Sequence, residues 1–193
     1  MITYIKGKLI EKNPTYAVIE SAGIGHFIHI SLNTFSKIPD EELVQLYTYF
    51  QVREDAHSLY GFFTQTEREV FRLLISVSGV GASTARVMLS SMTPQEIQQG
   101  IASDNVALIQ SVKGIGAKTA QRIIIDLRDK ILKTYDMETI SSTTSNTTKD
   151  EALSALDVLG FSRKQTERVI DMILRDHTNL DVENLIKLAL KKL

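Results

Sequence analysis

The sequence contains no cysteine, which excludes disulfide bonds and thiolate metal ligands. No apolar run approaches the roughly 20 residues that a membrane-spanning helix requires. The residues that follow Met1 enter a strand-like segment directly and lack the basic and apolar pattern of a signal peptide. These absences predict a cytoplasmic protein that holds no thiolate-bound metal.

Charge is distributed unevenly along the 193 residues, although the net charge is only −1. Residues 1–63 carry 5 Lys and Arg against 7 Asp and Glu, and residues 136–193 carry 8 against 10. Residues 64–135 carry 9 against 6 and form the one net-positive third. A basic segment favours an anionic partner such as nucleic acid. Such a partner is therefore expected to bind the centre of the chain.

Residues 1–63 have the pattern of short strands separated by turns. Extended segments are predicted over residues 2–11, 16–21, 25–31, 43–52 and 58–63, with a short helix at 32–38. Gly7 interrupts the first strand, as at the corner of a small barrel. Five strands with a helix between the third and fourth is the order of an OB-type β-barrel. A small β-sandwich is the alternative.

Residues 64–135 change to a helical period. Thr66 and Glu69 have the spacing of a capping box that opens a helix. Thr93-Pro94-Gln95-Glu96 places a cap, a first-turn proline and a glutamate in their favoured order. Ala117–Lys133 is long enough for several helical turns. This segment is predicted to be an all-α domain.

A polar stretch separates this segment from the C-terminal residues. Eight of the ten residues from Thr139 to Thr148 are Ser or Thr, a composition that cannot build a core. Residues 136–149 are therefore predicted to be a flexible linker. Residues 150–193 regain a helical period, with a second capping box predicted at Ser162 and Gln165 and a helix cap at Asp181. The whole is predicted to be a multi-domain α+β protein that ends in a three-helix, UBA-like module.

The most informative feature is an internal repeat with an offset of 35 residues. Gly79-Val80-Gly81 and Gly114-Ile115-Gly116 align at this offset, and Ala-x-Thr-Ala follows each of them. Self-similarity of this kind indicates one supersecondary unit used twice. Each copy reads as an apolar helix, a Gly-x-Gly turn and a second helix, which is a helix-hairpin-helix motif.

The two glycine turns suit a phosphate group. Glycine allows a tight turn and removes side chains that would hold a phosphate away. The helix that follows presents unpaired N–H groups and its positive dipole end. Such a site recognises the DNA backbone and carries little sequence information. Two copies are predicted to hold the two strands across a minor groove.

Three other functions compete with backbone binding as interpretations of the sequence. The segment 114–119 resembles the end of a nucleotide-binding loop, but Ala117 separates the glycine from Lys118-Thr119 and no strand precedes it, which argues against an ATPase. A helix-hairpin-helix repair enzyme is one alternative, although no carboxylate cluster suggests a nuclease. A single-strand-binding OB protein that stacks bases on Tyr47, Tyr49 and Phe50 is another. No cofactor or metal is expected.

Over essentially its whole length the sequence resembles the RuvA family, the Holliday-junction-binding subunits of the bacterial branch-migration complex. The resemblance is carried by the two glycine turns together with Val52-Arg53-Glu54-Asp55-Ala56, Leu59-Tyr60-Gly61-Phe62 and Leu159-Gly160-Phe161. It implies that residues 1–63 form a barrel that mediates tetramerisation. It also implies a DNA-clamping domain at 64–135 and a mobile module at 150–193 that docks on a ring-shaped ATPase.

The resemblance implies a set of partners. These are four-way junction DNA, further copies of the chain in one tetramer or two, the hexameric motor RuvB and the junction resolvase RuvC. The motor would hydrolyse ATP during recombination and repair, so this chain is implied to be non-catalytic. Glu54 and Asp55 match the family's acidic pin, whose negative charges would face the phosphates at the crossover and disfavour an intact duplex there.

The resemblance also assigns phosphate-binding side chains. In the second helix-hairpin-helix copy Lys118 and Arg122 correspond to phosphate contacts, and Thr119 adds a hydroxyl donor. The first turn departs from the family, because Ser83 stands where many relatives have lysine. Arg86, one turn further along, is expected to compensate in part. A shallower salt dependence than in a lysine-bearing relative follows.

In the C-terminal module the resemblance assigns apolar positions to the motor interface. These are Leu156, Leu159 and Phe161. The alternative is that they form the core of the three-helix module. A module of this size has little core to spare, so apolar groups that stay exposed would indicate a partner surface.

Overall fold

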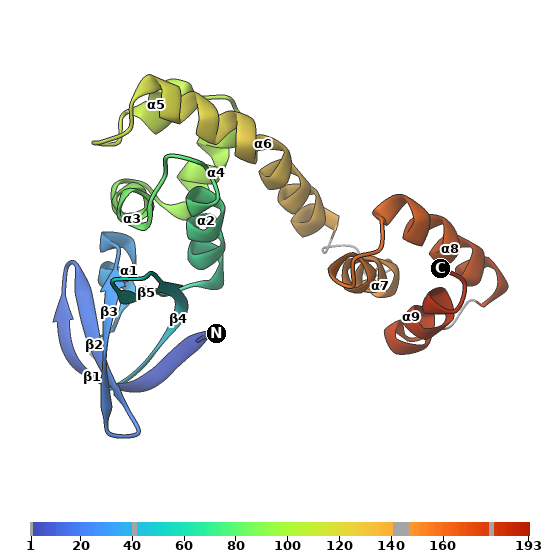
Figure 1. Ribbon diagram of the computed structural model, residues 1–193, viewed down its shortest axis with the longest axis horizontal. Helices are drawn as coiled ribbons and strands as arrows, with labels where there is room; N and C mark the ends of the chain where they lie inside the picture. The colour runs from blue at the N-terminus through green and yellow to red at the C-terminus, as the bar shows by residue number, and fades with distance from the viewer. Residues whose placement is uncertain (1, 40–41, 141–146, 178–179) are drawn as a thin grey trace. The chain divides into compact units, whose positions relative to one another are not determined.

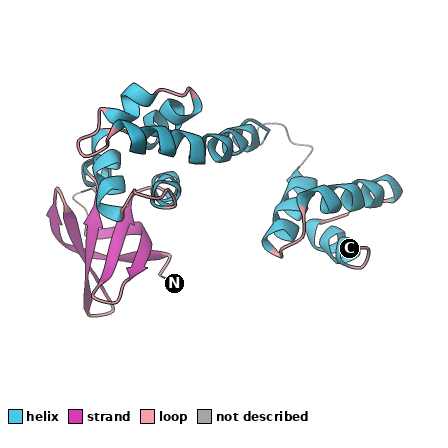
Figure 2. Cartoon of the chain, turned by 45° about the horizontal axis from the view of Figure 1, so that its top comes forward, coloured by secondary structure: helices cyan, strands magenta, loops and turns pink. Residues whose placement is uncertain are grey.

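The computed structural model describes residues 2–39, 42–140, 147–177 and 180–193 (Figure 1). The chain folds into two compact units, Met1–Lys133 and Thr134–Leu193. The strands of the described residues all lie in the first unit (Figure 2). Within the same residues, no helix has the length and apolar character needed to cross a bilayer.

Strands β1 to β5 close into a barrel in the order β1-β2-β3-β5-β4. Their bounds are Tyr4–Asn13, Tyr16–Ser21, Ile24–Ile30, Leu43–Val52 and His57–Phe62. Strands β3 and β5 pair in parallel, and the other neighbouring strands are antiparallel. Helix α1 (Leu32–Lys37) lies between β3 and β4 in the chain. The predicted OB-type barrel is confirmed.

Strand β1 passes very close to β2 at Gly7, where the sequence predicted a corner. Gly7 lies so close to β2 that a Cβ atom would be 2.0 Å from the carbonyl oxygen of Glu20, so only glycine fits this approach. The register with β2 also shifts between Leu9 and Glu11, as at a β-bulge. The barrel closes around its own core, whose fully buried side chains include Ile19, Ile28 and Leu46.

Helices α2 to α6 lie at one end of the barrel (Figure 1). Their bounds are Gln65–Ile75, Ala82–Ser91, Pro94–Ala102, Val106–Gln110 and Ala117–Ile140. Phe71 of α2 joins them to the barrel, because its ring centroid lies 4.9 to 5.5 Å from those of Tyr49, Tyr60 and Phe62. The barrel end and the helices therefore share one apolar core.

The helix start predicted at Thr93 is confirmed, and the capping box predicted at Thr66 is not. Thr93 and Glu96 bond reciprocally at the start of α4. The other prediction was wrong by two residues, because α2 is capped by Thr64, whose hydroxyl accepts from the Glu67 N–H at 3.2 Å. The sequence holds overlapping Thr-x-x-Glu pairs, and the barrel decides where the chain enters the helix.

The second unit is a three-helix module built from α7 (Thr147–Val158), α8 (Arg163–Asp176) and α9 (Val182–Leu190). Asp181 caps α9 as predicted, since its carboxylate accepts from the Asn184 N–H at 2.8 Å. Ser162 stands at the start of α8, but its hydroxyl donates to the Gln165 side chain at 2.8 Å instead of accepting from the helix.

The predicted linker needs correction at both ends. Helix α6 runs past residue 135 to Ile140, and α7 already begins at Thr147. Residues 136–140 and 147–149 are therefore helical, whereas 141–146 lie outside the described residues. Helical hydrogen bonds form within a segment and need no core, so a composition unable to build a core does not exclude a helix.

Candidate nucleic-acid interface

The two glycine turns have the same backbone conformation. Gly79 has a φ of 93° and Gly114 a φ of 92°, a left-handed region that favours glycine. The Val80 N–H donates to the Val77 carbonyl at 3.0 Å, and the equivalent bond at the second turn is 3.1 Å long. Residues 78–81 are called the first loop below, and residues 113–116 the second loop. The predicted duplication therefore holds in backbone geometry.

Each loop leads directly into the start of a helix. The first helical N–H bonds run from Ala85 to the Gly81 carbonyl and from Ala120 to the Gly116 carbonyl, both at 2.9 Å. The three amides before each of these have no helical acceptor and point out of the helix start. A Cβ atom on any glycine of either loop would meet no atom within 4 Å. Both helix starts are therefore open to an anion.

The residue between the glycines has a different role from the one predicted for it. Val80 and Ile115 are each only 5 % exposed, so their side chains fix the loops to the helical core. Their N–H groups are already bonded within the turns. These two residues position the loops, and the unbonded amides are those of the following helix starts.

The loops differ in charge although they match in backbone. Lys113 and Lys118 are exposed at the second loop and the start of α6. The residues 35 positions earlier are Ser78 and Ser83, which are exposed and neutral. Arg122 is also exposed on α6, one turn beyond Lys118, and Thr119 is half-buried between them. The positive charge predicted for the DNA interface is therefore concentrated at the second loop.

Arg86 does not take the compensating position expected of it. Its guanidinium donates to the Thr15 carbonyl of the barrel at 3.2 Å and lies 3.3 Å from the Nδ1 atom of His29. Burial and the neighbouring arginine lower the pKa of His29 below its usual value. Arg86 thus holds α3 against the barrel. The sequence could not indicate this, because Arg86 and Thr15 are 71 positions apart.

The predicted acidic pin lies in the turn between β4 and β5. Glu54 and Asp55 are exposed, and the Arg53 N–H donates to the Ala56 carbonyl at 2.9 Å to close the turn. The strands on either side pair up to Val52 and His57. Two carboxylates are therefore presented at the tip of a hydrogen-bonded hairpin, where their negative charge faces solvent.

A buried carboxylate, which the sequence analysis missed, joins the barrel to the helical domain. Glu67 of α2 is fully buried and accepts hydrogen bonds from the Ser31 hydroxyl at 2.5 Å and the Thr34 hydroxyl at 2.7 Å. Burial raises the pKa of Glu67, and these two hydrogen bonds oppose that change. Thr34 also accepts from the Phe63 N–H at 3.1 Å. This network fixes α1 against α2, which leads to the first loop.

The rings considered for base stacking are engaged within the protein. Tyr49 is half-buried and packs against Phe71, and the guanidinium of Arg68 covers the ring of Tyr47 at 5.5 Å. Phe50 lies edge-on to His57, 5.6 Å between centroids. None of the three rings forms an open stacking platform, which weakens the single-strand alternative.

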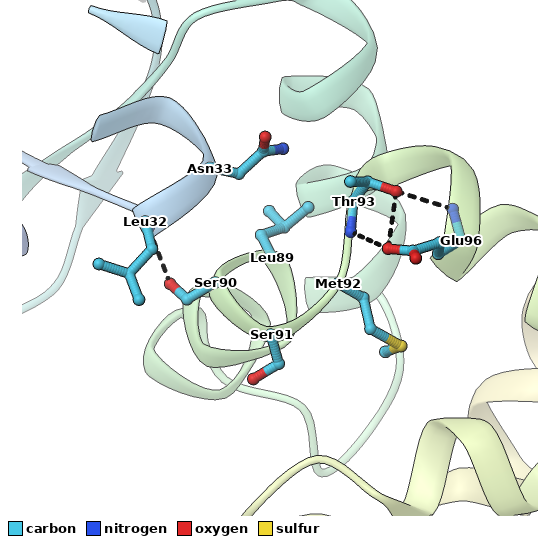
Figure 3. Close-up of a pocket in the computed structure, with 8 residues that line it drawn as sticks. All are labelled: Leu32, Asn33, Leu89, Ser90, Ser91, Met92, Thr93 and Glu96. Carbon is cyan, nitrogen blue, oxygen red and sulfur yellow. Dashed lines mark hydrogen bonds between the residues drawn. The ribbon is translucent and has the colours of Figure 1, made fainter. Parts of the chain in front are cut away.

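A pocket of about 260 Å³ is lined by residues from α1, the end of α3 and the start of α4 (Figure 3). Its hydroxyl and carboxylate groups are largely bonded to protein, since Ser90 accepts from the Leu32 N–H at 3.1 Å and Glu96 is held in its capping box with Thr93. Residues that line it are Leu32, Asn33, Leu89, Ser90, Ser91, Met92, Thr93 and Glu96. This pocket offers no cation to a phosphate and is not part of the interface.

The C-terminal module separates the residues predicted for a motor contact. Leu156 is fully buried in the core of the module, which favours the alternative of a core role for this residue. Phe161 is half-buried against that core. Leu159 is 58 % exposed, and Val158, which the sequence analysis did not select, is 89 % exposed. The exposed apolar pair at the end of α7 is therefore Val158 and Leu159.

Comparison with known proteins covers almost the entire chain. Residues 1–61 match the model of the RuvA N terminal domain, 71–129 that of the SAM-like helix-hairpin-helix tandem, and 148–193 that of the RuvA C-terminal domain. The chain is 61% identical to the Holliday junction branch migration complex subunit RuvA of Christiangramia forsetii, with both chains covered in full. It is 53% identical to the Flavobacterium psychrophilum subunit, again over the full length of both, and 47% identical to that of Cytophaga hutchinsonii, over 99% of each. The chain belongs to the RuvA family of Holliday junction branch migration complex subunits.

Proposed function

We propose that this chain is a cytoplasmic, non-catalytic subunit that binds four-way Holliday junctions through their phosphate backbone and recruits an ATPase that moves the branch point. The observation that carries the proposal is the pair of exposed loops with the same glycine conformation, each opening onto a free helix start. Two such sites in one compact unit bind two phosphate positions whose separation the fold sets. Backbone geometry, and not base sequence, is then recognised.

Selection of a junction over a duplex requires more than two anion sites. In a tetramer that brings four β4–β5 turns to one axis, the carboxylates of Glu54 and Asp55 repel phosphates at the centre. A continuous duplex would have to cross that centre, whereas the strands of an open junction pass around it. The exposure of both carboxylates supports this role. A second tetramer on the opposite face would enclose the same junction.

The C-terminal module supplies the contact with the motor in this proposal. Val158 and Leu159 are large apolar side chains left exposed beside a well-packed core, and such side chains suit a protein partner. The partner implied by the family is the hexameric ATPase RuvB. The resolvase RuvC would act on the same junction after branch migration.

The proposal is tested by comparing binding of a four-way junction with binding of a linear duplex of equal length in gel shifts. The wild-type chain is expected to prefer the junction. Glu54→Gln/Asp55→Gln should bind more duplex, because the central repulsion is lost. The control Glu11→Gln/Glu20→Gln removes the same charge from strands β1 and β2 and should keep the preference. Unchanged discrimination in the Glu54→Gln/Asp55→Gln variant would contradict the role of the pin.

Incubation with junction DNA and Mg²⁺ tests the non-catalytic assignment. The DNA strands should remain intact on denaturing gels at all protein concentrations. Cleavage that co-purifies with the chain would favour a helix-hairpin-helix repair enzyme instead.

A further inference from the structure

The first loop lacks a cation of its own. Residues 73–85 contain no charged side chain, whereas residues 108–120, which align with them at the 35-residue offset, contain Lys113 and Lys118. Both loops nevertheless have the same backbone and the same open approach. A phosphate at the first loop would therefore meet backbone amides but no local positive side chain.

The arginines on the two helices that flank the first loop are engaged elsewhere. Arg72 of α2 pairs with Glu69 at 3.3 Å. Arg68 donates to the Thr3 carbonyl at 3.0 Å. Arg86 of α3 is held on the barrel. A cation for the first loop must come from another part of the helical domain.

Arg122 of α6 reaches the first loop from the other half of the repeat. Its Nη1 atom lies 3.5 Å from the carbonyl oxygen of Ser78, directly before Gly79. This long hydrogen bond uses one of the five guanidinium N–H donors, so the planar group keeps donors for a phosphate. The residue that aligns with Arg122 in the first copy is Val87, which is 39 % exposed and carries no charge.

We propose that Arg122, although it follows the second loop in sequence, is the phosphate-binding cation of the first loop. The inference rests on the proposed function and adds to it which cationic side chain binds the phosphate at each loop. Lys113 and Lys118 serve the second loop, and Arg122 crosses to the first. Helix α6 and the loop before it then supply the cationic side chains for both phosphates, and the Ser78 carbonyl orients the crossing guanidinium.

The test maps which phosphate each side chain contacts. Four-way junctions are prepared with single methylphosphonate substitutions, which remove one phosphate charge at a time. Their affinity is measured for wild type, Arg122→Gln, Lys118→Gln, Ser83→Lys and the control Lys130→Gln, which removes a charge from the same helix two turns further on. Circular dichroism verifies that each variant is folded.

We expect the effects of Arg122→Gln and Ser83→Lys to depend on the same phosphate of the junction. Arg122→Gln should reduce the salt slope by about 0.9 log unit per engaged loop. The fall in affinity between 50 and 200 mM salt should then be about 3.5-fold smaller than in the wild type. Neutralising the first-loop phosphate should abolish both this loss and the gain from Ser83→Lys. The loss of affinity caused by Lys118→Gln should disappear when a different phosphate is neutralised. The effect of Lys130→Gln should not depend on either phosphate.

Two outcomes distinguish failure of this inference from failure of the proposed function. If Arg122→Gln is coupled to the same phosphate as Lys118→Gln, or to none, Arg122 is not the cation of the first loop. The proposed function would still stand in that case. If neither Lys118→Gln nor Ser83→Lys alters junction binding, backbone recognition by the loops is itself contradicted.

Discussion

The two helix-hairpin-helix loops have the same backbone conformation but differ in the charge of their side chains. Gly79 and Gly114 differ by 1° in φ, and the Val80 and Ile115 side chains are both buried, each with 5 % exposed. Yet the second copy carries two lysines where the first carries two serines. The repeated part is the part that shapes and fixes the loop. The difference teaches that loop geometry and loop charge are separable, because backbone amides can receive a phosphate while the cation comes from elsewhere in the domain.

The largest expected effect comes from exchanging charge between the loops. Lys113→Gln/Lys118→Gln should reduce the salt slope of junction binding by about 1.8 log units per engaged second loop, since each lost phosphate contact accounts for about 0.9. Ser78→Lys/Ser83→Lys should steepen the slope. The neutral control Ser78→Gln/Ser83→Gln should leave it unchanged. The slopes are obtained from affinities measured across a salt series. Equal slopes for Lys113→Gln/Lys118→Gln and Ser78→Lys/Ser83→Lys would refute the idea that the two loops differ in charge at the DNA.

A smaller effect, on folding stability, should be the same in both copies. Gly79→Ala and Gly114→Ala each place a side chain in the left-handed region, at a cost of about 1–2 kcal/mol. Since the two φ values agree, the two losses in the free energy of unfolding should agree as well. Urea denaturation measures both.

The matched controls for the glycine variants are Ser83→Ala and Lys118→Ala. Both positions are exposed, so the free energy of unfolding should change by no more than about 0.5 kcal/mol. A stability loss confined to one of the two glycine variants would show that the loops are not equivalent in backbone.

The smallest expected effect concerns the contact of α3 with the barrel, which Arg86 makes through the Thr15 carbonyl and His29. The pKa of His29 is lowered in the folded protein by burial and by Arg86, so the unfolded chain binds a proton first as the pH falls. His29 should therefore add to stability above its unfolded pKa of about 6.5, and that contribution should be lost as the pH falls through the lower, folded value. Denaturation at pH 7.5 and pH 5 measures the change.

The His29→Gln variant isolates this contribution from the carboxylates that titrate nearby. It should lose less stability than the wild type between the two pH values. The control His57→Gln affects an exposed imidazole and should behave like wild type. A wild-type pH dependence that persists in His29→Gln would remove His29 as its source.

The helix caps illustrate how far local patterns reach. Thr93 and Glu96 bond within four residues, and the sequence predicted their capping box correctly. Thr66 and Glu69 fitted the same rule and did not cap α2. Helix α2 begins two residues earlier, at the Thr64 cap. The Glu67 carboxylate there accepts hydrogen bonds from hydroxyls more than 30 positions earlier, in Ser31 and Thr34. A local rule holds when the competing partners are local, and fails when a distant segment offers a better partner.

The site residues divide in the same way. The glycine turns could be predicted because positive φ and free helix starts depend on the few residues of the loop itself. The roles of Arg86 and Arg122 could not, because each meets a carbonyl in a distant segment. Leu156 and Leu159 are the same residue type and lie three positions apart, yet Leu156 is buried and Leu159 is exposed. The packing of α7 against α8 and α9 decides between them.

By itself the sequence determined the barrel, the helical repeat and the position of both loops. These follow from hydrophobic periodicity, glycine placement and a duplication, all of which act over short stretches of chain. Tertiary structure alone decided that Arg122 lies beside the first loop, which carboxylate joins the barrel to the helices and which leucine remains on the surface. Each of those outcomes depends on an approach between segments distant in sequence, and the free energy of such a contact exists only once the chain has folded.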